Sequence, residues 1–489
     1  MRPLLLVFVL TTATAARCAP ALEQLQTATP PVFRSGHTLI PLSIWGPELP
    51  LATRVELADH WGYCLYFGRL RPELVKELDD PASITAQVCA LARAQPQRYP
   101  LQVITAPGFT LREYQDKLPE ACWVHDQEGK LPDGKQVWST EAPDEAFEMI
   151  ADAEAAMIQE VLKHAPIALL TNGGEYATSC LGWHKKLWEQ DPKIQAARGD
   201  RDWWEYLAER KTHQEMIIST RLRALVPDRR LYIYYYTEPP PFRMRWGGWK
   251  DWCWDYKHFR TVSDICNTSI YWRPGEDCWV GPYDLLTHAT NAVGQQLPYG
   301  DTWSYNWMSP GWEVKTAKQP WMSEPARYFG YLKCYYTAGM VGGVAGYFAY
   351  DSEDNWIWQL MCLGHVQALF SHLDGFVRNS ELLPGPDQHV WSADQPAYEL
   401  PTGAGREVRV LARKHQRRAE WLLTAWDTTG RRREVAVEAP ELGRVTLEAR
   451  GSGSVYHAKL VAGRPVLTLL DRFGQEPTKG LAPDWELQP

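Results

Sequence analysis

Short apolar runs alternate with longer amphipathic stretches between about residue 37 and residue 373. The short runs are typical of buried strands, and the stretches between them have the length and spacing of helices. Alternating strands and helices form a parallel sheet, and eight such units close a (β/α)8 barrel. The predicted strands are Leu39–Trp45, Tyr63–Phe67, Leu101–Ala106, Ile167–Thr171, Leu231–Tyr236, Ile265–Trp272, a seventh at Thr302–Trp307 or Gln319–Met322, and Gly343–Ala349.

Four stretches carry the clearest helical pattern. In Asp144–His164, apolar residues such as Phe147 and Ile150 recur three to four positions apart, which predicts one buried helix face. The other predicted helices are Trp203–Leu225, Ala326–Met340 and Trp356–Leu373. The last two flank the eighth predicted strand and so complete the alternation.

The chain changes character after a stretch at 374–388 that contains Gly and Pro. Short runs rich in Val and Leu follow, several of them alternating apolar and polar residues, with glycine-bearing turns between them. This pattern predicts an antiparallel β-sandwich of six to eight strands after the barrel. The predicted strands are Glu407–Ala412, Glu420–Trp426, Glu434–Glu438, Arg444–Ala449, Val455–Leu460 and Pro465–Leu470.

The first residues have the three parts of a secretory signal peptide. Arg2 precedes the apolar run Leu4–Leu10, and small residues follow up to Ala19. The run is too short to cross a bilayer, and no later stretch approaches the length that would. We therefore expect a signal peptide at 1–19, a barrel domain at 20–380, a sandwich at 388–475, and a secreted or periplasmic protein without membrane insertion.

The amino-acid composition limits the classes of ligand and cofactor that we expect the protein to bind. The formal net charge of −8 argues against a nucleic acid held by counterion release. The nine cysteines beyond the signal are sparse and odd in number, so we expect no disulfide framework, although one or two bridges are compatible with an oxidising compartment. Neither a CxxC pair nor an HExxH helix is present, so we predict no metal and no cofactor. The 24 Trp and 23 Tyr residues indicate an aromatic core or sugar-stacking surfaces.

The fourth predicted strand ends in the strongest functional pattern of the chain. Its apolar run stops at Asn172-Gly-Gly-Glu175. The two glycines permit a tight turn and close approach of a ligand, and the carboxyl end of a barrel strand is where active-site residues lie. A solvated loop glutamate is the alternative interpretation of Glu175.

At these residues the chain resembles clan A glycoside hydrolases, which carry an acid/base glutamate after strand four and a nucleophilic glutamate after strand seven. The resemblance implies that Glu175 is the acid/base, that Glu324 in Ser323-Glu-Pro325 is the nucleophile, and that the anomeric configuration is retained. The clan has Asn directly before the acid/base, whereas Asn172 stands three residues before Glu175. If strand seven is Thr302–Trp307, Glu324 falls on a longer loop, and its setting is also that of a helix N-terminus. Other acids near predicted strand ends could bind sugar hydroxyls or take its place as the second carboxylate, namely Glu238, Asp301, Asp351, Glu353 and Asp354.

Polar and aromatic side chains near the other predicted strand ends are candidates for substrate binding. Indole and phenol rings pack against sugar faces and still offer a polar atom, and Tyr271 or Tyr305 could also donate a hydrogen bond to the nucleophile. For any single Trp, core packing is the favoured interpretation. For the group as a whole, its position in loops and at strand ends favours a sugar-lined cleft. The predicted substrate-binding residues are Asn172, Glu238, Tyr271, Trp272, Trp303, Tyr305, Trp307, Trp321 and Asp351.

The sequence therefore predicts a secreted hydrolase that cleaves a polysaccharide or oligosaccharide with two carboxylates. Two alternatives stay open. One is a carbohydrate-binding protein that keeps the barrel without turnover. The other is a polysaccharide lyase, which would use a Tyr or His base and release an unsaturated product.

Overall fold

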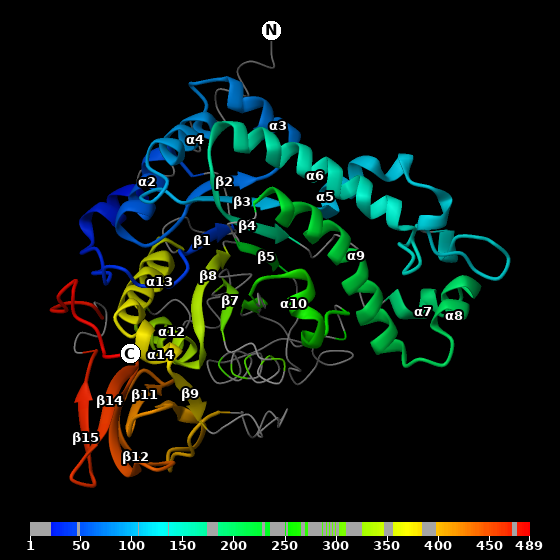
Figure 1. Cartoon of the computed structure of the whole chain (residues 1–489). Helices are drawn as coiled ribbons and strands as arrows, with labels where there is room; N and C mark the ends of the chain where they lie inside the picture. Colours follow the sequence, from blue (N-terminus) through cyan, green and yellow to red (C-terminus); the bar gives the residue numbers. More distant parts are fainter. Residues whose placement is uncertain are drawn as a thin grey trace. The chain divides into compact units, whose positions relative to one another are not determined.

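The computed structural model describes thirteen stretches of the chain (Figure 1) and single residues at 250, 286, 290, 293, 296 and 299. The stretches are 21–45, 49–105, 107–134, 136–173, 184–226, 230–234, 253–265, 269–271, 303–309, 325–346, 356–383, 398–471 and 477–489. The predicted signal peptide lies outside them. The chain divides into two compact units. Unit 1 is Met1–Cys64, Ile270–Pro298 and Thr302–Pro489, and unit 2 is Leu65–Ser269 and Tyr299–Asp301.

Unit 2 contains a parallel sheet in the order β2-β3-β4-β5. Every residue of β3 is buried, as expected for a parallel strand covered on both faces. Consecutive strands are neighbours in the sheet, so the connections that follow them leave from the same edge. The strands are β2 (Leu65–Arg69), β3 (Leu101–Thr105), β4 (Ile167–Gly173) and β5 (Arg230–Tyr234).

The helices of unit 2 begin at recognisable caps. Ser83, Asp191 and Asp202 accept hydrogen bonds from the first backbone amides of α4, α8 and α9. In α6, acidic residues in the first turn and basic residues in the last turn complement the helix dipole. The helices are α3 (Pro72–Lys76), α4 (Ile84–Ala94), α5 (Pro107–Tyr114), α6 (Asp144–His164), α7 (Lys185–Trp188), α8 (Pro192–Arg198), α9 (Trp203–Leu225) and α10 (Phe259–Val262), with 3-10 turns at Glu77–Asp79, Gln115–Lys117, Glu120–Cys122, Pro132–Gly134 and Tyr256–His258.

Unit 1 contains a second sheet, in the order β1-β8-β7-β6. The β1–β8 and β7–β8 pairs are parallel. The strands are β1 (Ser43–Trp45), β6 (Ser269–Tyr271), which starts at the unit boundary, β7 (Ser304–Ser309) and β8 (Met340–Gly346). All eight predicted strands are therefore present, and strand seven is the Thr302–Trp307 alternative. They form two four-stranded sheets, and the closed barrel stays a prediction.

Helix α13 (Trp356–Ser371) is apolar around its whole circumference. A helix of this kind must be covered on every side, and nearly all of its residues from Ile357 onward are buried. Gln367 is one of its few polar residues, and its amide donates to the carbonyl of Ile40 at 2.8 Å. Unit 1 also contains α2 (Leu51–His60), α12 (Pro325–Ala338) and α14 (Asp374–Arg378), and residues 21–27 are helical.

The C-terminal sheet, β9 to β15, completes unit 1. Its strands pair antiparallel except where Trp426 of β11 meets Arg450 of β13. Each of the six predicted C-terminal runs coincides with one of its strands, and β9 adds a seventh that the sequence pattern did not show. The strands are β9 (Ser380–Leu383), β10 (Val408–His415), β11 (Glu420–Asp427), β12 (Arg432–Ala439), β13 (Gly443–Arg450), β14 (Ser454–Val461) and β15 (Arg464–Leu469), and Gly405–Glu407 forms a 3-10 turn.

Candidate active site

The carboxyl end of β4 carries a buried amide that has no partner among the described residues. Asn172 is fully buried, and neither its Oδ1 nor its Nδ2 has a hydrogen-bond partner among the described residues. Its backbone pairs in register with Thr105 of β3 and Ile233 of β5. A buried amide left without partners destabilises a protein by about 1–3 kcal/mol. Because Asn172 lies at the carboxyl end of a parallel strand, where barrel proteins place their site residues, it is a candidate functional residue.

Thr171 adds a second polar atom at the same strand end. Its Oγ1 is buried and also has no hydrogen-bond partner among the described residues. Neighbouring residues of a strand point to opposite faces of the sheet, so Thr171 and Asn172 present their polar atoms on different sides. β4 ends at Gly173, and Glu175 follows two residues later, outside the described residues.

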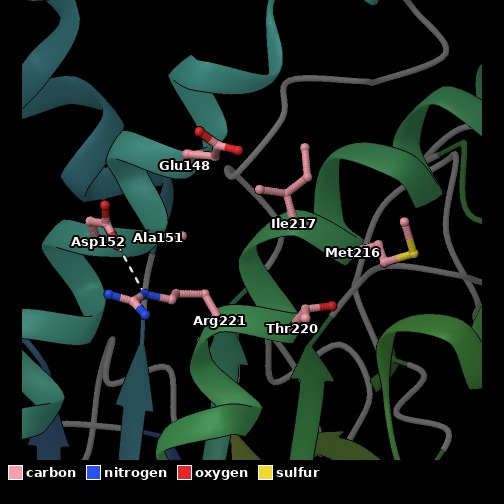
Figure 2. Close-up of a pocket in the computed structure, with 7 residues that line it drawn as sticks. All are labelled: Glu148, Ala151, Asp152, Met216, Ile217, Thr220 and Arg221. Carbon is pink, nitrogen blue, oxygen red and sulfur yellow. Dashed lines mark hydrogen bonds and ion pairs between the residues drawn. The ribbon is translucent and has the colours of Figure 1, made fainter.

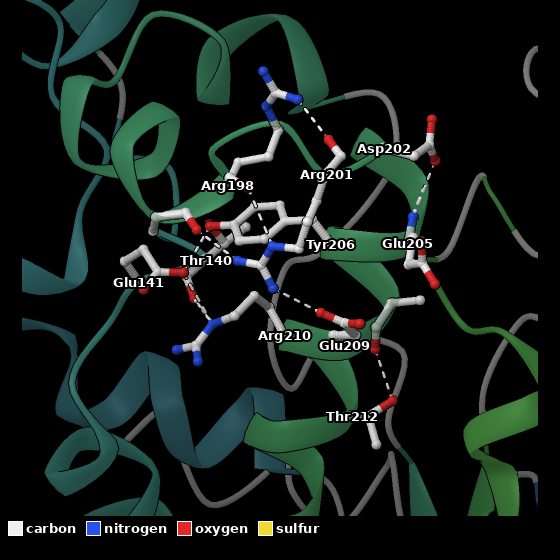
Figure 3. Close-up of polar contacts among 12 residues, drawn as sticks. Thr140, Glu141, Arg198, Arg201, Asp202, Glu205, Tyr206, Glu209, Arg210 and Thr212 are labelled. Carbon is white, nitrogen blue, oxygen red and sulfur yellow. Dashed lines mark hydrogen bonds and ion pairs between the residues drawn. The ribbon is translucent and has the colours of Figure 1, made fainter.

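A polar network holds the connection between β3 and α6 against α9 (Figure 3). The hydroxyl of Tyr206 donates to Glu141 Oε1 at 2.6 Å and lies 2.8 Å from Thr140 Oγ1. Arg210 Nε donates to the carbonyl of Thr140 at 2.9 Å and lies 3.0 Å from Glu141 Oε1. Burial raises the pKa of Tyr206 well above its usual value, so the phenol keeps the proton that it donates. Two strand-end connections of unit 2 are thus fixed to each other.

An apolar cluster supports the same region. It combines residues from the connections that follow β3, β4 and β5, among them Val137, Trp188 and Cys253. Trp188 is fully buried, and its indole Nε1 donates to the carbonyl of Trp138 at 3.0 Å. Both of these tryptophans pack the interior, so the high Trp content partly reflects an aromatic core.

Glu215 is a buried acid that the sequence patterns did not single out. It lies on α9, is fully buried, and neither carboxylate oxygen has a hydrogen-bond partner among the described residues. Burial raises its pKa to about 7, and the charge of Lys211 opposes this shift. The helical spacing of Leu207, Ile218 and Leu222, all buried, places Glu215 on the inner face of α9 and could have revealed it.

Two of the predicted substrate-binding aromatic residues, Tyr305 and Trp303, lie in unit 1 and make contacts that are typical of packing residues. The hydroxyl oxygen of Tyr305 lies 2.8 Å from the carbonyl of Pro41 and 2.9 Å from Ser43 Oγ, and the residue is fully buried. Trp303 directly precedes β7, at the amino end of the strand, and the guanidinium groups of Arg378 and Arg413 lie 5.3 Å and 5.4 Å from its ring centroid. These contacts favour packing roles for both residues.

The remaining predicted residues divide into two groups. Tyr271 ends β6 and Trp307 lies in β7, where its backbone pairs with Val344, and their side chains fall outside the described part. Six others lie wholly outside the described residues, namely Glu175, Glu238, Trp272, Trp321, Glu324 and Asp351. The described residues therefore do not test whether the predicted site residues come together, and that grouping stays a prediction.

The end of β7 adds one candidate that sequence reasoning missed. β7 ends at Ser309, so Glu313 follows it after four residues and Glu324 only after fifteen, directly before α12. In barrel enzymes the site residues stand at strand ends. Once strand seven is placed at Ser304–Ser309, Glu313 is a second candidate for the nucleophile, and the unresolved choice between two strands had hidden it.

A surface groove of about 470 Å³ lies between α6 and α9 (Figure 2). Ala151, Met216 and Ile217 contribute its apolar lining, and Arg221 Nε donates to Asp152 Oδ1 across it at 2.9 Å. Its walls are helix faces, and it contains no predicted site residue. The groove is therefore a separate feature from the strand end at Asn172.

The described residues show neither a group of metal-binding side chains nor a disulfide bond. The described residues include no group of three or more His, Cys, Asp or Glu side chains suited to hold a metal ion. The six described cysteines are buried and unbridged. None of the described helices is long and apolar enough to cross a membrane.

Comparison with solved structures finds glycoside hydrolases. The β-galactosidase of Halorubrum lacusprofundi has 12% identity and a TM-score of 0.43, covering 69% of this chain and 59% of its own. The β-galactosidase of Rahnella sp. R3 has 12% identity and a TM-score of 0.42, covering 70% and 58%. The endo-β-1,4-mannanase of Thermotoga petrophila has 10% identity and a TM-score of 0.28, covering 78% and 93%.

The chain thus spans less than two thirds of the length of these two β-galactosidases. No family model matches the sequence, and no curated protein matches it. All three TM-scores lie below 0.5.

Proposed function

We propose that this protein is an exported glycoside hydrolase that cleaves a polysaccharide or oligosaccharide on a (β/α)8 barrel. The observation that carries the proposal is the end of β4, where the buried amide of Asn172 has no partner among the described residues. Sugar hydroxyl groups both donate and accept, so one hydroxyl-rich ligand could satisfy both ends of the amide. Glu175 follows three residues later in the sequence, after the strand end where a barrel places its site residues.

The chemistry needs two carboxyl groups with different protonation states. Glu175 as a protonated acid donates to the glycosidic oxygen, and a second carboxylate attacks the anomeric carbon. The second group is Glu324 or Glu313. Water then hydrolyses the glycosyl ester while Glu175 acts as the base, and the anomeric configuration is retained.

The aromatic and acidic residues of the later connections fit substrate binding. Trp272, Trp321, Tyr271 and Trp307 could stack on sugar rings, and Glu238 and Asp351 could accept bonds from hydroxyl groups. Trp303 and Tyr305 are the weaker members of the predicted set, because cationic and backbone groups already contact them.

A panel of plant and algal polysaccharides tests the proposal, with reducing-end release and product chromatography as readouts. Glu175→Gln should lower kcat by about a thousandfold or more while the melting temperature is kept. Glu313→Gln and Glu324→Gln, assayed in parallel, identify the second carboxylate. Glu128→Gln is the control, because Glu128 is exposed and pairs with exposed Lys130, and it should retain full activity.

The outcomes separate the alternatives. If Glu175→Gln cleaves as well as the wild type, the acid assignment is wrong. If the wild type binds a glycan in the panel without releasing reducing ends, the protein is a carbohydrate-binding protein. A product that absorbs in the ultraviolet would instead identify a lyase.

A further inference from the structure

Helix α12 is buried on nearly its whole surface, and much of that burial comes from the C-terminal sheet. Every residue from Tyr328 to Ala338 is buried. The helix contacts β10, β11 and β14 of the sheet, as well as β8 and α13, and Figure 1 shows it beside the sheet. An outer helix of a barrel ordinarily keeps a polar face toward solvent. Here the C-terminal sheet occupies that face.

The contact is close-fitting at one pair of glycines. A Cβ atom at Gly330 of α12 would collide with the indole of Trp426, and one at Gly453 would lie 2.9 Å from the Cα of Gly330. Trp426 is itself held in place, because its Nε1 donates to the carbonyl of Gly451 at 2.9 Å. The turn between β13 and β14 therefore rests directly on the helix backbone.

Hydrogen bonds and an ion pair also hold α12 against the C-terminal sheet. The ammonium of Lys333 donates to the carbonyls of Ser452 and Gly453 at 2.7 Å and 3.2 Å and pairs with the carboxylate of Asp471. One turn later, the hydroxyls of Thr337 and Thr424 lie 2.6 Å apart. Buried polar contacts of this kind fix a single register between two elements.

The sheet shows no sugar-stacking surface of its own in the described residues 398–471. Its four aromatic residues in that range are all buried, namely Tyr398, Trp421, Trp426 and Tyr456. A carbohydrate-binding module would instead present exposed rings to its ligand. The aromatic residues of this sheet are used for packing.

We infer that the C-terminal sheet is a positioning element of the hydrolase, acting through α12, and that Gly453, Lys333 and Asp471 are its positioning residues. α12 begins at Pro325 and so anchors one end of the connection that carries Glu313 and Glu324 in the sequence. The inference rests on the proposed hydrolase activity for its kinetic readout. A displacement of about 1 Å at a reacting group lowers turnover by about a hundredfold, so a shifted helix should affect kcat before KM.

A matched pair of glycine variants tests the inference in the full chain. Gly453 and Gly463 both lie in hairpin turns of the sheet with similar positive φ, +70° and +75°. A Cβ at Gly453 meets α12, whereas a Cβ at Gly463 meets nothing within 4 Å. Gly453→Ala and Gly463→Ala thus introduce the same backbone strain, and only the first pushes on the helix.

We expect Gly453→Ala to lower kcat by about tenfold or more with KM within about twofold of wild type, measured well below its melting temperature. Gly463→Ala should lose only thermal stability. Thr424→Val serves if Gly453→Ala does not fold, because it removes the hydroxyl that contacts Thr337 of α12 and leaves no buried charge unpaired. Wild-type kcat in Gly453→Ala, or in Thr424→Val where Gly453→Ala does not fold, would show that the sheet only stabilises the fold.

Hydrogen exchange in the first two turns of α12 gives a readout that needs no substrate. Exchange there should be faster in Gly453→Ala than in Gly463→Ala if the sheet positions the helix. Equal exchange in the two variants would overturn the inference. If the wild type cleaves no glycan but exchange still differs, the hydrolase proposal fails and the positioning role stands.

Discussion

The carboxyl group of Glu215 lies on α9 one helical turn after the ammonium of Lys211, and both residues are buried. Among the described residues, the Glu215 carboxylate and the Lys211 ammonium form no ion pair. The Lys211 Nζ lies 5.8 Å from the ring centroid of Trp254. Desolvation of the carboxylate therefore outweighs the attraction of the ammonium, and the pKa of Glu215 rises to about 7.

The first prediction concerns the pH dependence of stability. The folded pKa of Glu215 is raised above its ordinary value, so its contribution to stability is fully present below about pH 4.5 and is lost as the pH rises to about 7. Each pH unit in that window costs about 1.4 kcal/mol. Glu215→Gln should therefore be more stable than the wild type at pH 8, by about 3 kcal/mol at most, and should show no gain at pH 4.5.

Urea unfolding at both pH values measures this difference. Glu209→Gln is the control on the same helix, because Glu209 is part-exposed and pairs with Arg201, and surface pairs contribute at most about 1 kcal/mol. Equal stability of the Glu215→Gln variant and the wild type at pH 8 would show that the carboxylate is better solvated than its burial indicates.

The second prediction concerns the buried ion pair of Lys333 and Asp471. Neither side chain is more than 1% exposed, so removing one partner leaves an uncompensated charge. Lys333→Met should destabilise the protein by about 3–5 kcal/mol. The double variant Lys333→Met with Asp471→Leu should recover most of that loss, because two apolar side chains carry no desolvation penalty. A double-mutant cycle in urea measures the coupling, and additive losses would contradict it.

The elements that the sequence predicted best are those with local signals. α6 and α9 match the predicted ranges in full because their apolar spacing and their boundary residues agree. Strand seven was ambiguous because 302–307 and 319–322 are both short apolar runs, and tertiary pairing with β8 decides for the first. β9 was missed because four residues beside a Gly and Pro stretch carry too little pattern.

The candidate site was less predictable, since its geometry depends on partners far away in sequence. The sequence predicts Asn172 as a site residue from its place before Glu175, but its lack of partners among the described residues is visible only in the folded chain. The sequence predicts Trp303 as a sugar-stacking residue, and Arg378 and Arg413 reach its ring from elements much later in the chain. Such contacts leave no trace in local periodicity.

The third prediction concerns the cysteines. Burial raises the pKa of the Cys122 thiol to about 11 and that of Cys89 to about 12, and the thiolate is the reactive form. The six described cysteines, Cys64, Cys89, Cys122, Cys253, Cys334 and Cys362, should resist a thiol reagent in the native protein and react only on unfolding. Mass spectrometry of peptides labelled before and after addition of guanidinium measures this. Native labelling at Cys89 would contradict the burial.

The fourth prediction concerns Asn172, where stability and function should move in opposite directions. Leu is similar in size to Asn and has no polar atoms, so Asn172→Leu removes two buried atoms that lack partners among the described residues. In the free protein this should raise the free energy of unfolding by about 1–3 kcal/mol. In the proposed hydrolase the same change removes bonds to the substrate, and kcat/KM should fall by about ten- to a hundredfold.

The contrast between the two measurements is what identifies a ligand-binding amide. Residues kept for function at the expense of stability show this opposition, whereas a structural Asn would lose stability on substitution and leave kcat/KM of the folded fraction unchanged. Asn379→Leu is the control, because its amide already donates to the carbonyl of Gly375 at 2.8 Å in an exposed position. We expect Asn379→Leu to change the free energy of unfolding by no more than about 1 kcal/mol. The change in activation free energy calculated from kcat/KM should stay within the same limit. A loss of stability in Asn172→Leu would mean that the amide has a structural partner and that the case for a sugar-binding strand end must rest on Glu175 alone.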